Sequence, residues 1–221
     1  MYTLIMDLDG TLIDSVPDIS ASLNRALESE GLSLLNVEQV RALISHGTRV
    51  MIENAMRASC NGKRDQEVNL DLLRDRFLAE YSARPTENTV VYPGVLEILD
   101  KFKTEGFRLG ICTNKPEKTA YPVLRALGLE DYFSVIVCGD TLPYNKPDPR
   151  HVHEVVNLLG GDPATSVFVG DSEVDIAAAR NAGLPMVLVS YGYSLSPPEE
   201  LDFDALINHF NELPGILSTL I

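Results

Sequence analysis

The sequence is poor in positive charge, and this limits its partners. It has 18 Lys and Arg against 32 Asp and Glu in 221 residues, which gives a net charge of −14. A surface of that sign repels nucleic acids and anionic membranes, so we expect neither as a partner. It also repels phosphorylated molecules. A site that binds one must therefore supply positive charge locally.

Cysteines and long apolar runs are scarce as well. Cys60, Cys112 and Cys138 lie far apart, and the last two lie in apolar, strand-like runs, which predicts buried reduced thiols rather than a zinc site. No apolar stretch approaches the ~20 residues that cross a bilayer. Asp7 interrupts the first apolar run, which argues against a signal sequence. We therefore expect a cytoplasmic protein.

Five short apolar runs predict β-strands, at Thr3–Met6, Arg108–Thr113, Val135–Cys138, Ser166–Val169 and Met186–Ser190. Amphipathic stretches follow three of them and predict helices at Glu117–Leu127, Arg150–Leu159 and Val174–Ala182. Alternating strands and helices predict an α/β fold, with a doubly wound, mainly parallel, Rossmann-like sheet. In such a sheet, functional side chains gather at the carboxyl ends of the strands.

Only helical patterns occur between Asp14 and about Val90. Apolar residues share one helix face at Ile19, Leu23, Ala26 and Leu27, and again at Leu70, Leu73, Phe77 and Tyr81. Asn36 and Gln39 are spaced like a capping box that opens a helix at Val37–Ile44. The sequence therefore predicts an α/β core of residues 1–14 and 86–221, with an all-helical insert of residues 15–85 after the first strand.

Two acids follow the first predicted strand, in the motif Asp7-Leu8-Asp9-Gly10-Thr11. Residues two apart on an extended chain point to the same side, so these carboxylates repel each other unless a cation or a proton intervenes. Gly10 permits a turn by which the chain leaves the sheet. Taken alone, the motif is equally consistent with an exposed acidic turn.

A second acidic cluster, Gly170-Asp171-Ser172-Glu173-Val174-Asp175, follows the fourth predicted strand. Asp171 stands at the strand tip, where it could meet Asp7 and Asp9 across the edge of the sheet. A few carboxylates with water completing the shell suit Mg²⁺. The alternative is that these acids cap the next helix, and Asp175 could do only that.

Positive charge and phosphoryl ligands follow two other strands. The second ends in Thr113-Asn114-Lys115, where a hydroxyl and an amide can hold phosphoryl oxygens. Lys146 precedes Pro147, which favours an extended backbone and so aims the lysine side chain. A single lysine in a loop is more often solvated, but this one lies between two acidic clusters.

In this order, the motifs resemble those of the haloacid-dehalogenase-like hydrolase superfamily. They are Asp7-Leu8-Asp9-Gly10-Thr11, Thr113-Asn114, Lys146-Pro147, and Gly170-Asp171 through Asp175. The helical insert is similar to that superfamily's first type of cap domain. Thr113-Asn114-Lys115, Cys138-Gly139-Asp140-Thr141-Leu142-Pro143 and Gly192-Tyr193-Ser194 are similar to its phosphoglycolate phosphatase group.

The resemblance implies a magnesium-dependent phosphatase whose Asp7 forms an aspartyl phosphate and whose Asp9 is the general acid and base. It implies that Asp7, the backbone carbonyl of Asp9, and Asp171 hold Mg²⁺, with Ser172 and Asp175 in support. The remaining implied roles are stabilisation of the transferring group by Thr113 and Lys146, and substrate binding by Thr11, Asn114, Gly47 and Arg49.

We expect a small phosphorylated metabolite as substrate, 2-phosphoglycolate first. A phosphosugar phosphatase, for example for an amino-sugar acid 6-phosphate, or a phosphosugar mutase would keep the same core residues. A dehalogenase is disfavoured because it needs no metal, and a receiver-type phospho-acceptor, which is not an enzyme, because it is about half as long and lacks the insert. A monomer and a homodimer are both compatible with the sequence.

The loop Ser45-His46-Gly47-Thr48-Arg49 interrupts two helical stretches of the insert and suits a position facing the core. Arg49 is the predicted partner of a substrate carboxylate, although a solvated arginine is the alternative. His46 is of interest only through this loop. We expect His151, His153 and His209 at the surface.

Overall fold

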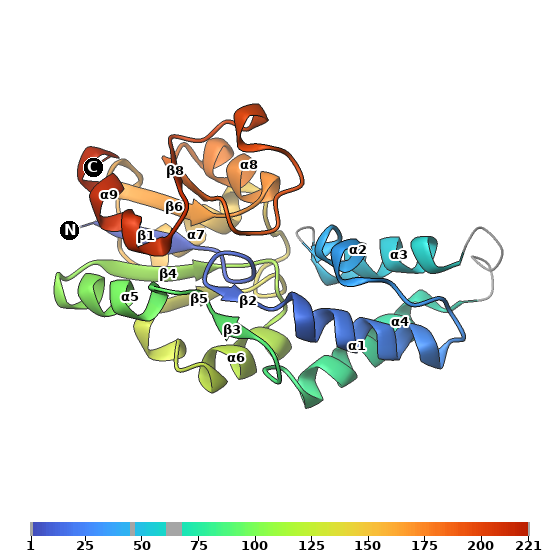
Figure 1. Cartoon of the computed structure of the whole chain (residues 1–221). Coiled ribbons are helices and arrows are strands. Elements are labelled where there is room, and N and C mark those ends of the chain that lie inside the picture. The colour runs from blue at the N-terminus through green and yellow to red at the C-terminus, as the bar shows by residue number, and fades with distance from the viewer. Residues whose placement is uncertain (1, 45–46, 61–67, 221) are drawn as a thin grey trace.

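One parallel six-stranded sheet forms the centre of the protein. The computed structural model describes residues 2–44, 47–60 and 68–220. The strands lie in the spatial order β5-β4-β1-β6-β7-β8 (Figure 1). They are β1 (Thr3–Met6), β4 (Arg108–Cys112), β5 (Val135–Val137), β6 (Ser166–Gly170), β7 (Met186–Val189) and β8 (Ala205–Ile207). The five predicted strands are confirmed with ends shifted by at most one residue, whereas β8 is not in the prediction.

Helices cover both faces of the sheet. In β1, Leu4 and Met6 belong to one buried cluster, and Ile5 belongs to the other. The first cluster includes α5 (Val95–Thr104), α6 (Glu117–Ala126) and α9 (Leu213–Leu220), and the second includes α7 (Pro149–Leu158) and α8 (Glu173–Ala182). Because both faces are covered, the strands are mostly apolar, with polar residues at the first positions of β1, β4 and β6. The doubly wound α/β architecture is confirmed.

The strand order reverses beside β1. From β1 the chain continues to β4 and β5 on one side, then crosses to β6, β7 and β8 on the other. Such a reversal opens a crevice at the carboxyl ends of the two central strands. β1 and β6 run in register, from Thr3 opposite Ser166 to Met6 opposite Val169. Residues that directly follow these two strands therefore meet at the crevice.

In the described residues, four α-helices lie in sequence between the short strands β2 and β3, and Figure 1 shows them grouped to one side of the sheet. They are α1 (Val16–Ser29), α2 (Val37–Arg41), α3 (Thr48–Ser59) and α4 (Leu70–Ala83). Most of the predicted apolar faces are buried, at Ile19, Leu23, Ala26, Leu27, Leu73, Phe77 and Tyr81. The capping box of Asn36 and Gln39 is present, although α2 ends earlier than predicted. All four helices fall within the predicted insert, residues 15–85.

None of the helices in the described part of the chain combines the length and the apolar composition that crossing a membrane requires.

A two-stranded antiparallel ribbon, β2 (Ile13–Asp14) with β3 (Val90–Val91), connects the helical group to the sheet. Beside it, the buried Asp18 carboxylate of α1 accepts hydrogen bonds from the backbone N–H groups of Asn88 and Thr89 and from the Thr89 hydroxyl, at 2.7 to 3.0 Å. Burial alone would raise the pKa of Asp18, but these hydrogen bonds lower it below its ordinary value. Asp18 therefore fastens α1 to the returning chain.

Replacing Asp18 with alanine should lower the free energy of unfolding by about 2–4 kcal/mol, because buried N–H donors lose their acceptor. In the parent protein, the Asp18 carboxylate contributes to the free energy of unfolding above its ordinary pKa of 3.8. This contribution is lost as the pH falls through the lower pKa that Asp18 has in the folded state. Urea unfolding of both proteins at pH 7 measures the difference. Asp71→Ala, which removes an exposed partner of Arg74, is the control and should change the free energy of unfolding little. Equal stabilities of the Asp18 variant and the parent would refute the role.

The expectation for His151 is wrong, because its side chain is fully buried. It lies on the inner face of α7, where Nδ1 is 3.5 Å from Cys112 Sγ and Nε2 is 3.1 Å from the Cys138 carbonyl. Burial, helped by the nearby Lys146 charge, lowers the pKa of His151 to about 4. His209 is exposed as expected, and His153 is half-buried. Cys112 and Cys138 are buried, as predicted.

Candidate active site

Three carboxylates meet where β1 and β6 end. Asp7 follows β1, and its backbone N–H donates to the Val169 carbonyl of β6 at 3.0 Å. Asp171 is the first residue after β6, and Asp175 lies in the first turn of α8. One carboxylate oxygen from each of Asp7, Asp171 and Asp175 lies within 4.8 Å of the others. Asp7 and Asp171 therefore meet at the crevice as predicted, whereas the Asp9 carboxylate is not part of this cluster.

The surroundings of these acids fit a divalent cation. Asp171 accepts hydrogen bonds from Thr11 Oγ1 at 3.0 Å and from the Tyr193 backbone N–H at 2.7 Å. Burial raises the pKa of Asp171 well above its ordinary value, and the Asp175 and Asp7 charges raise it further. Burial also raises the pKa of Asp7, to about 7, against the opposing Lys146 charge. A bound cation stabilises such crowded carboxylates as anions, and an all-oxygen donor set suits Mg²⁺.

Lys146 bridges two of the acids, Asp7 and Asp175. Its Nζ lies 2.9 Å from Asp7 Oδ1 and 2.6 Å from Asp175 Oδ1, and its side chain is 2% exposed. Burial opposes the ammonium charge, but Asp175 and Asp7 together raise the pKa of Lys146 above its ordinary value. The lysine is therefore held charged beside Asp7 rather than solvated in a loop.

Asp175 organises the start of α8. Its Oδ2 accepts from the Ser172 hydroxyl at 2.7 Å and from the backbone N–H groups of Ser172 and Asp171 at 3.1 and 3.2 Å. Ser172 Oγ in turn accepts from the Asp175 backbone N–H, which completes a capping box. Both interpretations of Asp175 given by the sequence hold together: it caps the helix and it also lies in the acid cluster.

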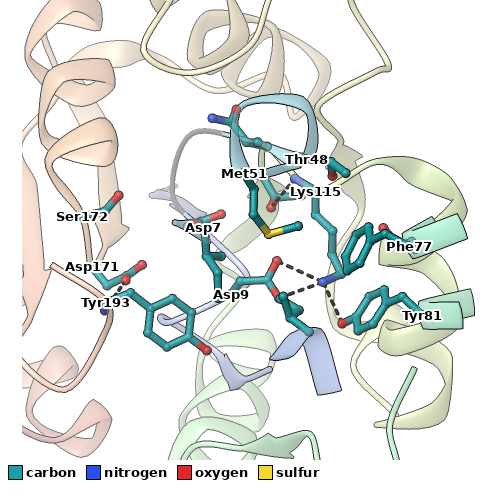
Figure 2. A pocket seen from close by; sticks show the side chains of 16 residues that line it. Asp7, Asp9, Thr48, Met51, Phe77, Tyr81, Lys115, Asp171, Ser172 and Tyr193 are labelled. Carbon is teal, nitrogen blue, oxygen red and sulfur yellow. Dashed lines mark hydrogen bonds and ion pairs between the residues drawn. The ribbon is translucent and has the colours of Figure 1, made fainter. Parts of the chain in front are cut away.

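Asp9 is held by two residues to which the sequence analysis assigned no role. Ser15 Oγ donates to Asp9 Oδ1 at 2.5 Å, and Lys115 Nζ lies 2.9 and 3.1 Å from the two Asp9 carboxylate oxygens. Lys115 Nζ also donates to the Tyr81 hydroxyl of α4 at 2.9 Å, so it links the sheet side of the site to the helical group (Figure 2). Its place directly after Thr113-Asn114 at a strand end was the signal that could have identified Lys115.

The residues proposed to hold phosphoryl oxygens lie nearby. Thr113 and Asn114 directly follow β4, the other neighbour of β1, and both line the same pocket as Asp7. The Asn114 side-chain amide donates to the Lys146 carbonyl at 3.0 Å, which ties the ends of two loops together. Gly47 lines the pocket from the helical side, at the N-terminus of α3.

The pocket is a cavity of about 50 Å³ between the strand ends and the helical group. Its helical wall is largely apolar, and the described lining on that side is Ile19, Ile44, Gly47, Thr48, Met51, Phe77 and Tyr81. Arg49 is not in this lining: its guanidinium pairs with Glu53 at 3.2 Å, and its side chain is 67% exposed. Ser45 and His46 of the same loop lie outside the described residues.

Gly10 and Gly192 leave room for the Asp171 side chain. A Cβ on Gly10 would lie 2.3 Å from Asp171 Oδ2, and one on Gly192 would lie 2.2 Å from Asp171 Cβ. Gly10 also has a φ of +86°, which side chains rarely adopt. Any residue larger than glycine at position 10 or 192 would therefore clash with the Asp171 side chain.

Gly192→Ala should displace Asp171 and weaken Mg²⁺ binding by about 10- to 100-fold, the range typical of disturbed groups around metal ligands. Titration calorimetry of the purified protein with Mg²⁺ measures this directly. Gly215→Ala is the matched control, because a Cβ there meets nothing within 4 Å. The same Mg²⁺ affinity in both variants would contradict the steric argument.

Comparison with known proteins finds similarity along the whole chain. The family model for haloacid dehalogenase-like hydrolases matches residues 4–189. A phosphoglycolate phosphatase of Agrobacterium fabrum (strain C58) is 40% identical over 218 residues, which cover 98% of this chain and 93% of that protein. One of Caulobacter vibrioides is 39% identical over 99% of this chain and 92% of its own length. The crystal structure of a predicted phosphoglycolate phosphatase from Haemophilus somnus 129PT has a TM-score of 0.90 at 31% identity, and the match covers 98% of this chain and 97% of that one.

Proposed function

This chain belongs to the haloacid dehalogenase-like hydrolase family, and we propose that it is a magnesium-dependent phosphatase that acts through an aspartyl phosphate on Asp7. It is a phosphoric monoester hydrolase, as its phosphoglycolate phosphatase relatives indicate. The observation that carries the proposed mechanism is the meeting of Asp7, Asp171 and Asp175 around Lys146 at the sheet's crevice.

In the first step, a carboxylate oxygen of Asp7 attacks phosphorus and the bond from phosphorus to the leaving oxygen breaks. Asp9 gives its proton to that oxygen, so the product leaves as an alcohol. Thr113, Asn114 and Lys146 offset the charge of the transferring group through hydrogen bonds and positive charge. Asp7, the Asp9 backbone carbonyl and Asp171 would hold Mg²⁺, which would supply positive charge that reduces the repulsion between Asp7 and the phosphate.

In the second step, water attacks the aspartyl phosphate. Asp9, now a carboxylate, takes a proton from that water, and the bond from phosphorus to Asp7 breaks to release inorganic phosphate. Thr11 fixes the Asp171 carboxylate, and Ser172 and Asp175 order the surroundings of the cation. The helical group, residues 15–85, acts as a cap that excludes bulk water from the first step and contacts the leaving group.

We further propose 2-phosphoglycolate as the preferred substrate. The name that the Agrobacterium fabrum and Caulobacter vibrioides relatives share supports this choice. Phosphosugars remain the alternative substrates because the core residues do not distinguish between them.

The test is steady-state hydrolysis of a panel of phosphorylated metabolites, with and without Mg²⁺. The rate is measured as the release of inorganic phosphate. The expected result is multiple turnovers that require Mg²⁺, with the highest kcat/KM for 2-phosphoglycolate. Preference for a hexose phosphate would overturn the substrate proposal alone. Absence of turnover with every ester, or full activity in excess chelator, would overturn the mechanism.

A further inference from the structure

Lys115 supplies the positive charge in the described lining of the active-site pocket. That lining contains the carboxylates of Asp7, Asp9 and Asp171, and among its described members Lys115 alone is a lysine or arginine. The Lys115 side chain is only 5% exposed, so bulk water screens its charge little. A substrate carboxylate that enters this pocket is repelled by the acids unless it lies beside Lys115.

The position of Lys115 suits a short leaving group. Lys115 Nζ lies 2.9 Å from Asp9 Oδ1, and Asp9 is the proposed proton donor to the leaving oxygen. In 2-phosphoglycolate, a single methylene separates that oxygen from the carboxylate. Contact between Asp9 and the leaving oxygen therefore keeps the substrate carboxylate near Asp9, within the part of the pocket that Lys115 lines.

The ammonium group of Lys115 can offer one of its N–H donors to a substrate. It carries three N–H bonds, and two of its three observed contacts go to the two oxygens of the same Asp9 carboxylate. The third goes to the hydroxyl of Tyr81, whose ring lies 4.5 Å from Nζ, measured to the ring centroid. One donor is enough to hold Asp9, so another can turn to the substrate without loss of either neighbour.

Arg49 and Arg41 of the helical group are placed differently. Arg49 points away and pairs with Glu53. Arg41 lies over the Tyr193 ring, with Cζ 5.2 Å from the centroid, and its guanidinium donates to the Gly192 carbonyl at 3.5 Å. Neither belongs to the described lining, whereas Figure 2 shows Lys115 reaching into the pocket between Asp9 and Tyr81.

We infer that Lys115 binds the carboxylate of the substrate and thereby selects phosphate esters that carry a carboxylate next to the ester carbon. This inference rests on the proposed phosphatase function, and it assigns to Lys115 the recognition that the sequence assigned to Arg49. Tyr81 of the helical group holds the ammonium in place from the opposite side.

The experiment compares kcat/KM for 2-phosphoglycolate with that for ethyl phosphate, which lacks only the carboxylate oxygens. The parent protein should prefer 2-phosphoglycolate. Lys115→Met should lower the ratio of the two values by about 10- to 100-fold, the worth of a hydrogen bond to a charged group, mainly through KM for 2-phosphoglycolate. Lys115→Arg, which keeps the charge, should retain more of the preference. Arg49→Ala is the control and should leave the ratio within about twofold.

Three results would overturn the inference while leaving the phosphatase function intact. They are an equal loss on both esters in Lys115→Met, a collapsed ratio in Arg49→Ala, and a parent protein that hydrolyses both esters equally well. Lys115→Gln serves as a second uncharged variant if the methionine protein fails to fold, as judged by thermal unfolding. A parent protein that hydrolyses neither ester but turns over a sugar phosphate would overturn this inference and the substrate proposal, whereas no turnover of any ester would overturn the proposed phosphatase function as well.

Discussion

Asp7→Asn is expected to reduce the turnover of 2-phosphoglycolate by at least about 10⁴-fold, because loss of a covalent nucleophile removes the reaction path itself. The amide has nearly the same shape as the carboxylate but is a poor nucleophile towards phosphorus. Release of phosphate under saturating substrate and Mg²⁺ measures the effect. In the parent protein, rapid acid quenching followed by mass analysis should find a phosphoryl group on the peptide that contains Asp7.

The fold should survive this substitution. Burial raises the pKa of Asp7 to about 7, so the metal-free folded state binds a proton more tightly than the unfolded chain does. Its stability therefore falls as the pH rises from the ordinary value of 3.8 through about 7. Asparagine avoids that cost, so the unfolding temperature of Asp7→Asn at pH 8 without metal should not fall below that of the parent. Asp131→Asn, at an exposed position, is the control and should keep full activity. Residual turnover above one-hundredth of the parent's would exclude Asp7 as the nucleophile.

Asp171→Asn is expected to raise the Mg²⁺ concentration for half-maximal activity by more than about 100-fold, because a ligand to the cation contributes more than the groups around it. The Asp171 carboxylate is buried, and Thr11 and Tyr193 aim it at the acid cluster. An amide in its place keeps the shape but removes a negative charge that the cation needs. Calorimetric titration with Mg²⁺ should show the same loss of affinity without reference to activity.

Asp175→Asn is the informative comparison for Asp171. Asp175 contacts Lys146 and the backbone at the start of α8, so its replacement should weaken Mg²⁺ binding by about 10- to 100-fold, less than the loss at Asp171. A larger loss at Asp175 would make it the principal ligand and would assign Asp171 to the outer shell. An unchanged Mg²⁺ response in Asp171→Asn would remove it from the cation site.

The sequence could predict that Asp7 and Asp171 lie close together, because this prediction depended on local patterns. Asp7 and Asp171 each directly follow an apolar run, and a parallel sheet brings the ends of neighbouring strands to one edge. Lys146 could be placed near them for the same reason. The roles of these residues stay predictions until the variants are measured, but their proximity is a property of the fold.

Side-chain direction could not be predicted in the same way. The sequence pattern predicts a polar loop at Arg49, but the residue lies in the first turn of α3, and its guanidinium pairs with Glu53 one turn along the same helix. His151 occupies the inward face of α7, which became recognisable only when α7 was seen to pack on the β4 and β5 side of the sheet. For His151 the deciding contact is with the sheet, whose position relative to α7 the sequence pattern does not give, whereas Arg49 pairs within its own helix.

By itself, the sequence determined the α/β alternation, the helical insert and the acids at the strand ends, because each follows from the period of apolar residues and from adjacency along the chain. Tertiary structure alone decided that Lys115 holds Asp9, 106 positions earlier, together with Tyr81 of the helical group. That triad depends on how the insert packs over the sheet. Packing between distant segments is set by the whole core rather than by any local motif.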